Sequence, residues 1–527
     1  MNGALLRTTS AFAIAAAAGL FATFATSAKA ADLGVGGSCC ADLEERVAEL
    51  EATAARKGNR KVRLTVSGQV NETLLFWDDG KESNAYVLTN ENSRSRFRFT
   101  GDAKINPEWS AGYLLEIGVR IANTGNVDQF VDDDTASNRS LDLRHSTWWI
   151  ESSRLGRVWV GLTDMATDGI TGINLSNASL IGTDAINDWQ GGFFLRSDNN
   201  TRSTLSGLRW RDISSQANAN VGGGDERNVV RYVAPTFAGF TASAAWGEDD
   251  FVDAALRYAA EFSGVRVAAG IGVQDWTDGN AFSSRFPGGF TGSQGDRGCA
   301  DLDFAKSGLG RNNDSDVDCN TVGMSGSIMH VPTGLYIHAA YGKLEDENRK
   351  NLFARQTAKF SVPTNNNNNN APVQLTSGPI ANADDEDEHW YVQGGIERNF
   401  FGIGNSAFYG EYFHGDTGAG LNGGNVRLVA LGDPLNPAGV GSLGVDAFIA
   451  SSEVDVWGFG LVQTIDAAAM DLYIGFRNYS GDVTLAANVI TTVNNNNGTT
   501  STVSTIKRRE VDVEDFQALM TGGIIRF

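Results

Sequence analysis

Polar and apolar residues alternate strictly over Ser93–Ile105. One face carries Arg94, Arg96, Arg98, Thr100, Asp102 and Lys104, and the other carries Phe97, Phe99, Ala103 and Ile105. A period of two indicates a β-strand whose two faces meet different surroundings. Unpaired arginines are too costly to bury in a dry core. The stretch therefore fits a barrel wall between lipid and water, or equally a surface strand of a soluble sandwich.

The same alternation recurs along the chain and favours the barrel. Trp109–Ile121 places Glu116 and Arg120 on the wet face, and Leu141–Glu151 does the same for Asp142 and Arg144. Sixteen strands are predicted in all: Lys61–Trp77, Ser93–Ile105, Trp109–Ile121, Leu141–Glu151, Arg157–Thr163, Asn228–Ala234, Phe240–Gly247, Phe251–Glu261, Val265–Gln274, Thr321–His330, Leu335–Tyr341, Glu388–Arg398, Ser406–His414, Glu453–Gln463, Met470–Tyr479 and Glu510–Phe527.

The predicted connections alternate between turns of a few residues and long loops, which is typical of outer-membrane barrels. Trp77, Trp109, Tyr258 and Tyr341 fall near strand ends, as interfacial aromatic residues do. An even number of strands lets an antiparallel sheet close, and about sixteen leave a water-filled lumen. The fold class predicted for residues 61–527 is therefore an all-β transmembrane antiparallel barrel.

The first 60 residues predict export and a short helical segment. Met1–Ala30 reads as a signal peptide cleaved after Ala30, with a membrane anchor as the alternative. Residues 31–60 predict a periplasmic helix followed by a basic joint. The helix carries a seam of apolar residues at coiled-coil spacing: Leu43, Val47, Leu50 and Ala54. This seam either tethers copies of the chain to one another or packs on the barrel end.

The formal net charge of −21 argues against nucleic acid as a partner. It fits surface loops that bridge to anionic lipid through divalent cations, or it serves solubility alone. Asp314, Asp316 and Asp318 have the spacing of a calcium loop but lack the glycine and the closing glutamate of an EF-hand. A solvated acidic loop is the competing interpretation, and no other cofactor is indicated.

The cysteines predict one disulfide. Cys299 and Cys319 bracket a Gly/Asp/Asn-rich segment of an exported chain, and we expect a bond between them, whereas the role of the adjacent Cys39 and Cys40 stays open. The five histidines are scattered, and no Gly-x-Ser-x-Gly motif appears. An enzyme is therefore not predicted, although a barrel hydrolase and a non-conducting adhesin remain alternatives to a channel.

Several motifs together resemble the trimeric general porins of Gram-negative outer membranes, and their alphaproteobacterial branch in particular. They are Ser-Arg-Phe-Arg-Phe-Thr-Gly at 95–101, Gly-Arg-Val-Trp-Val-Gly at 156–161, Arg231-Tyr232 before Pro235–Phe240, and the terminal Phe527. The resemblance implies a homotrimeric channel for passive diffusion of small hydrophilic solutes and ions. It also implies that outer-membrane lipid, lipopolysaccharide and the barrel-assembly machinery, which reads Phe527, are partners.

The resemblance further implies that the loop after the fifth strand, residues 164–203, folds into the lumen. Its acids, Asp164, Asp168, Asp184 and Asp188, would then face a basic wall. The pore-lining candidates on that wall are Arg94, Arg96, Arg98, Lys104, Glu116, Arg120, Asp142 and Arg144. Opposed charges across a narrow aqueous gap order passing solutes by charge and dipole.

Overall fold

The computed structural model describes residues 62–132, 140–196, 204–214, 226–247, 251–278, 316–346, 359–360, 373–374, 385–418, 426–427, 446–494 and 500–527. Contacts divide the chain into two units, Met1–Leu64 and Thr65–Phe527, and the second unit contains the barrel. The predicted signal peptide and periplasmic helix lie outside the described residues. None of the helices in the described ranges is long and apolar enough to cross a membrane.

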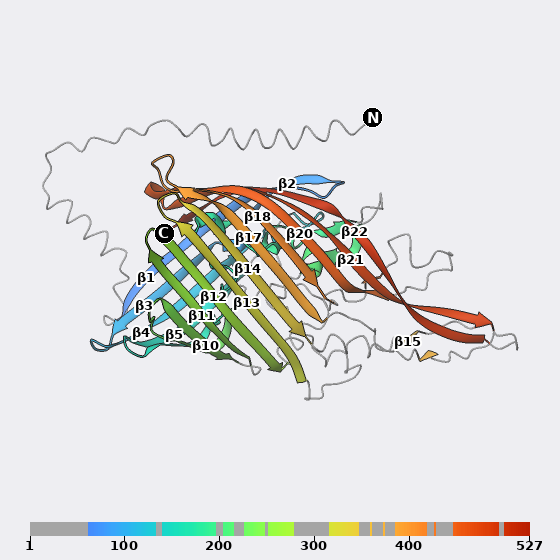
Figure 1. The fold of residues 1–527 in the computed structure, drawn as a ribbon, viewed down its shortest axis with the longest axis horizontal. Helices are drawn as coiled ribbons and strands as arrows, with labels where there is room; N and C mark the ends of the chain where they lie inside the picture. Colours follow the sequence, from blue (N-terminus) through green and yellow to red (C-terminus); the bar gives the residue numbers. More distant parts are fainter. Residues whose placement is uncertain are drawn as a thin grey trace. The chain divides into compact units, whose positions relative to one another are not determined.

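The second unit is built on one antiparallel sheet of 18 strands, of which β2 and β19 are short side strands. The other sixteen form the wall: β1 (Arg63–Asp78), β3 (Arg96–Lys104), β4 (Trp109–Arg120), β5 (Ser140–Ser152), β6 (Gly156–Asp164), β9 (Glu226–Val233), β10 (Phe240–Gly247), β11 (Val252–Phe262), β12 (Val265–Asp278), β13 (Asp316–His330), β14 (Leu335–Asp346), β17 (Glu386–Arg398), β18 (Ser406–Thr417), β20 (Asp446–Ile465), β21 (Met470–Asn494) and β22 (Thr500–Arg526). β1 pairs with β3 on one side and with β22 on the other, so the sheet closes into a barrel (Figure 1).

The remaining described elements lie in the connections. They are β2 (Ser83–Thr89), β7 (Phe194–Arg196), β8 (Thr204–Arg209), β15 (Lys359–Phe360), β16 (Val373–Gln374), β19 (Val426–Arg427), the short 3₁₀ helices η1 (Glu91–Ser93), η2 (Asn177–Leu180) and η4 (Asp466–Ala468), and the one-turn helices α3 (Asn187–Gln190) and α4 (Trp210–Ile213). Each of the sixteen predicted strands coincides with one wall strand, which confirms the barrel.

The two faces of the wall differ as the alternation predicts. In β1, Val66 and Val70 are each 52% exposed, whereas Asn71 and Thr73 are buried on the inner side. The outer face continues around the barrel with exposed apolar side chains such as Tyr113, Trp148 and Phe240. An apolar exterior is what a strand facing lipid requires.

The connections alternate in length around the rim. One end carries short turns, such as residues 153–155 between β5 and β6 and residues 263–264 between β11 and β12. The other end carries the long connections, with residues 248–251 between β10 and β11 and residues 495–499 between β21 and β22 as short exceptions. The longest, residues 165–225 between β6 and β9, sends its described parts into the barrel interior, where they pack with inward-facing wall residues in the main buried apolar cluster.

Candidate functional site

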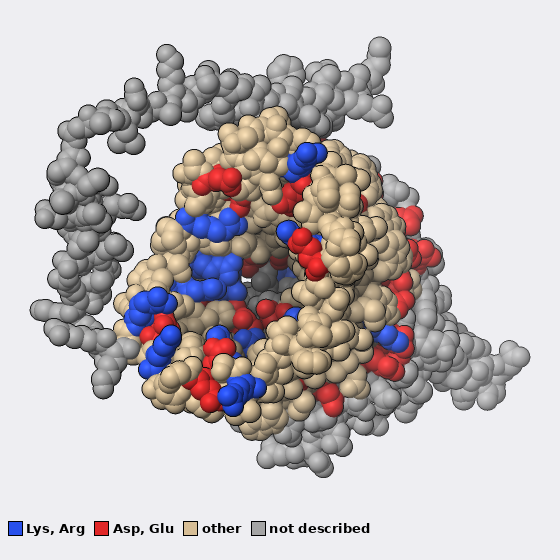
Figure 2. Space-filling view, turned by 60° about the vertical axis from the view of Figure 1, so that its left-hand side comes forward, with Lys and Arg blue, Asp and Glu red and all other residues tan. Residues whose placement is uncertain are grey.

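Glu116 lies on the inner face of β4 at the centre of an arginine cluster. Its carboxylate is fully buried and contacts the guanidinium groups of Arg96 (3.3 Å) and Arg144 (2.9 Å), and that of Arg98 from Nε (2.5 Å). The side chains of Arg98 and Arg96 are 41% and 22% exposed, against 0% for Glu116. The charge that water in the lumen meets here is therefore mainly positive. Figure 2 shows Lys and Arg side chains gathered along one side of the opening.

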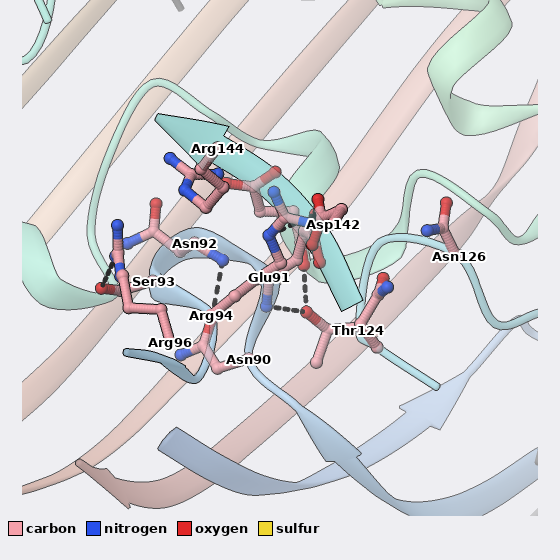
Figure 3. A network of polar contacts seen from close by, with 12 residues as sticks. Asn90, Glu91, Asn92, Ser93, Arg94, Arg96, Thr124, Asn126, Asp142 and Arg144 are labelled. Carbon is pink, nitrogen blue, oxygen red and sulfur yellow. Dashed lines mark hydrogen bonds and ion pairs between the residues drawn. The ribbon is translucent and has the colours of Figure 1, made fainter. Parts of the chain in front are cut away.

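Arg94 precedes β3 and belongs to the same cluster. Asn90 caps η1 by accepting a bond from the Asn92 N–H (3.0 Å), and the Thr124 hydroxyl accepts from the Glu91 N–H (3.1 Å). The turn so fixed directs the Arg94 side chain to Asp142 (3.1 Å) and back toward Glu91 (3.7 Å), as seen in Figure 3. The four arginines thus take their counter-charges from the wall and from η1.

A β-bulge in β5 adds a fourth acid to this cluster. The β4–β5 pairing jumps from Glu116↔His145 to Ile117↔Leu143, which leaves Arg144 as an extra residue. Consecutive side chains, the partly buried Arg144 and the buried His145, consequently both point to the inner side, as bulges near functional sites allow. Arg144 reaches Glu226 at the start of β9 as well as Glu116.

The first half of the in-folded loop runs along the inner wall from β11 to β17. The Thr167 N–H and hydroxyl donate to Asp253 (2.7 and 2.8 Å) on β11. The Ile173 and Leu175 N–H groups donate to serine hydroxyls of β13 (3.1 and 3.2 Å). Asn174 donates to Gln393 (2.7 Å) on β17. This half of the loop therefore lines the wall from β11 to β17 and not β3–β5, where the arginine cluster lies.

Aromatic side chains fix the second half of the loop against β20–β22. Trp189 of α3 and Phe193 are fully buried, and Phe193 packs on Phe516 of β22 with ring centroids 4.8 Å apart. Arg477 of β21 lies over the Trp189 ring (4.7 Å) and is paired with the buried Glu411 (2.7 Å). A buried arginine needs such a partner, and the pair holds the loop through the Thr183 carbonyl (2.7 Å).

The four predicted loop acids lie at separate places along this path. Asp164, the last residue of β6, is beside His145 (3.5 Å) and Arg231 (3.8 Å). Asp168 is partly buried, and burial, followed by the charges of Asp164 and Glu226, raises its pKa to about 7. Asp188 lies in α3, where its carbonyl accepts a bond from the Thr124 hydroxyl.

Asp184 is the deepest of the four. Its carboxylate lies 3.4 Å from His389 Nε2 on β17. Burial alone disfavours its charge, yet the hydrogen bond to His389 and the histidine's charge lower the pKa of Asp184. The counter-charges in contact with Arg94, Arg96, Arg98 and Arg144 are therefore Glu91, Glu116, Asp142 and Glu226, whereas Asp164 and Asp184 contact His145, Arg231 and His389.

The other predicted residues are placed as follows. Lys104 is exposed at the short-turn end of β3, and Arg120 ends β4 opposite Ser140. Asp316 and Asp318 belong to extended β13, with Cys319 opposite Trp276 and Asp346. Asp314, Cys299 and the seam residues Leu43, Val47, Leu50 and Ala54 lie outside the described residues. The calcium site and the Cys299–Cys319 bond stay predictions.

Sequence reasoning missed three contributors to the site. Glu226 begins a strand whose predicted start was Asn228, so it was not counted as a wall residue. His145 was set aside because the histidines are scattered in the sequence. The bulge that turns it inward contains no glycine that would have marked it. The Arg477–Glu411 pair joins β21 to β18 across 66 positions in the chain. Only the alternation of each strand, which places both residues on the inner face, could have suggested it.

The family model described as "Gram-negative porin" matches the chain from residue 13 to residue 432. The chain belongs to the Gram-negative porin family. It forms a water-filled channel of the outer membrane for passive diffusion of small hydrophilic solutes and ions. Family membership favours a channel over the hydrolase and adhesin alternatives.

Solved structures of similar fold are distant in sequence. An anion-selective porin from Comamonas acidovorans is 12% identical, with 88% of this chain and 100% of that chain covered and a TM-score of 0.45. OmpT of Vibrio cholerae is 11% identical, covering 90% and 100%, with a TM-score of 0.43. OmpF of Salmonella typhi, in complex with daunomycin, is 11% identical, covering 89% and 98%, with a TM-score of 0.42. No curated protein sequence matches the chain significantly.

Proposed function

We propose that the arginine cluster sets the ion preference of the channel. The observation that carries the proposal is the difference in exposure between Arg98 (41%) and Glu116 (0%), which contact each other. A passing ion contacts the exposed guanidinium groups, whereas the carboxylate of Glu116 that balances their charge is buried in the wall. Side chains two residues apart on a strand are separated by about 7 Å, so Arg96 and Arg98 form a short positive ladder along the flow.

Replacing Arg94, Arg96 and Arg98 together with Gln tests this role. The reversal potential in a salt gradient across a planar bilayer should shift toward cations, because three positive charges beside Glu91, Asp142 and Glu116 are then removed. The shift should be largest at low salt, since screening weakens the field as ionic strength rises. The matched control is Arg266→Gln, which removes an exposed arginine that pairs with Glu261. Equal selectivity in the folded triple variant and the wild type would refute the proposal.

We also propose that the chain assembles as a homotrimer of the alphaproteobacterial porin type. The support is the sequence resemblance over the motifs at 95–101, 156–161 and 231–240, together with the apolar seam Leu43–Ala54. In this proposal lipopolysaccharide surrounds the outer rim, Phe527 is read by the assembly machinery, and the mature chain starts after Ala30. Light scattering of the protein in mild detergent measures the subunit number, and a purely monomeric species would contradict the proposal.

A further inference from the structure

A histidine and two carboxylates converge at the neck of the in-folded loop, which we define by Asp164 and Glu226. Asp164 ends β6, Glu226 begins β9, and the two residues are direct cross-strand partners. His145 Nε2, turned inward by the bulge, lies 3.5 Å from Asp164 Oδ1 and 3.8 Å from Glu226 Oε1. One nitrogen and one oxygen from each acid all lie within 4.8 Å of one another.

The imidazole is held there without a good hydrogen bond. His145 is 4% exposed, and its Nδ1 has no hydrogen-bond partner among the residues that the structure describes. Its Nε2 is too far from either carboxylate oxygen for a strong hydrogen bond. A bare Nε2 lone pair would be repelled by the two oxygen acceptors that it faces, so either a proton on Nε2 or a bound cation must lie between the three groups.

Two neighbouring arginines also contact these carboxylates. Arg231 lies nearest Asp164 Oδ2 (3.8 Å), whereas His145 faces Oδ1. Arg144 contacts Glu226 Oε1, the same oxygen that faces His145, and is shared with Glu116, so a cation bound at this oxygen would compete with Arg144. These contacts orient the carboxylates, much as outer-shell partners orient the ligands of metal sites.

We propose that His145, Asp164 and Glu226 form a binding site for a divalent transition-metal cation of the Zn²⁺ class. Metal–ligand distances of about 2.0–2.1 Å put tetrahedral ligand atoms about 3.3 Å apart, close to the separations found here. One imidazole nitrogen with two carboxylate oxygens suits Zn²⁺ better than Mg²⁺ or Ca²⁺, which prefer oxygen alone. A bound ion would tie together the two ends of the in-folded loop and lie in the path of permeating ions.

The first test measures binding without any current. Wild-type protein, freed of metal and held in detergent, is titrated calorimetrically with Zn²⁺ beside His145→Gln and His414→Gln. His414 is the matched control because it also lies beside two acids, Glu453 and Asp455, on the other side of the barrel. We expect H145Q to weaken one Zn²⁺ site at least tenfold and H414Q to leave that site unchanged. Folding is checked by the heat-dependent gel mobility of the barrel.

Asp164→Asn provides a second variant should H145Q fail to fold, and it should weaken the same site. Wild-type protein that binds no Zn²⁺, or a folded variant at the neck that binds it as tightly as wild type, would overturn the proposal. Single-channel recording adds an independent readout. Zn²⁺ should reduce the wild-type current, Mg²⁺ at the same concentration should not, and H145Q should be insensitive. Equal Zn²⁺ sensitivity in H145Q would also count against the site.

Discussion

Three guanidinium groups around one carboxylate repel one another, so their stability depends on that carboxylate being present and ionised. Glu116 occupies this position with no exposed surface, while Arg96, Arg98 and Arg144 share its two oxygens. Removing one member of a buried ion network leaves the other charges uncompensated, and such losses cost about 3–5 kcal/mol. The arginine cluster therefore depends on Glu116, although this residue has no surface that permeating ions could contact.

Glu116→Gln should accordingly lower barrel stability by about 3–5 kcal/mol and shift selectivity toward anions. The unfolding midpoint in denaturant measures the first effect, and the reversal potential measures the second. Glu151→Gln is the control, because Glu151 forms a partly exposed pair with Arg157 near a short turn (2.6 Å) and should cost little. A variant as stable as the wild type would mean that the arginines find other partners.

Asp168 should make the channel sensitive to pH near neutrality. Its pKa is raised to about 7, because burial and the charges of Asp164 and Glu226 disfavour its ionised form. A carboxyl whose folded pKa lies above its unfolded value of about 3.9 stabilises the fold fully below pH 4, and this contribution is lost as pH rises through 7.

Between pH 6 and pH 8 we therefore expect wild-type channels to become more cation-selective as Asp168 ionises, and the packing of the loop to loosen. Asp168→Asn, which mimics the protonated form, should flatten this dependence. Reversal potentials recorded at each pH measure the effect. An unchanged pH profile in the folded variant would assign the titration to another group.

At the scale of the element, strands were predictable because each obeys a local rule. Phe240–Gly247 was predicted with its observed bounds, since two faces in different surroundings impose a period of two on the sequence itself. The predicted Glu453–Gln463 was shorter than β20, because beyond the membrane the alternation carries less contrast. The bulge at Arg144 escaped prediction, since one extra residue shifts the register without any special residue type.

The path of the in-folded loop was not predictable from the chain alone. Its placement depends on pairs far apart in sequence, such as Trp189 with Arg477 and Phe193 with Phe516. Apolar residues in a loop show that it is buried somewhere, but not which strands cover it. The loop aspartates were expected to face a basic wall; Asp164 contacts His145 and Arg231, and Asp184 contacts His389.

Trp189→Ala should release the loop from the wall of β20–β22. Truncating a buried tryptophan costs about 3–5 kcal/mol and here also removes the ring beneath the Arg477 guanidinium. We expect a larger spread of single-channel conductance and more open-channel noise, with the barrel still inserted. The control is Trp148→Ala, because Trp148 is 53% exposed on the outer face. Equal noise in both variants would show that Trp189 does not anchor the loop.

At the scale of the whole molecule, the wall satisfies its own backbone. Every wall strand is hydrogen-bonded to two neighbours within the chain, so a barrel requires no second copy to be stable. Association of copies then rests on side-chain surfaces, either on the outer wall or on segments outside it, and the predicted seam Leu43–Ala54 is one candidate.

Deleting residues 31–60 should therefore weaken trimerisation while leaving each barrel folded. Light scattering in mild detergent gives the mass of the assembly, and the heat-dependent gel shift reports the folded barrel. Leu43→Asp with Leu50→Asp, placed within the seam, should reproduce the effect of the deletion. A trimer of unchanged stability in both variants would exclude the seam as the contact between copies.

The pairing of β1 with β22 affects the order in which the barrel folds. Gly68 and Phe527 exchange two backbone bonds (2.9 and 3.0 Å), and the Thr73 hydroxyl donates to the Thr521 carbonyl across 448 positions of the chain. Neighbouring hairpins can form early, but this joint cannot form until the last residue has arrived. From export to completion, the first strand must wait with an unpaired edge, which is open to pairing with any passing strand. The chain is thus most exposed to wrong strand pairing before the barrel closes. Protection of the β1 edge during that interval should determine how much of the chain reaches the membrane.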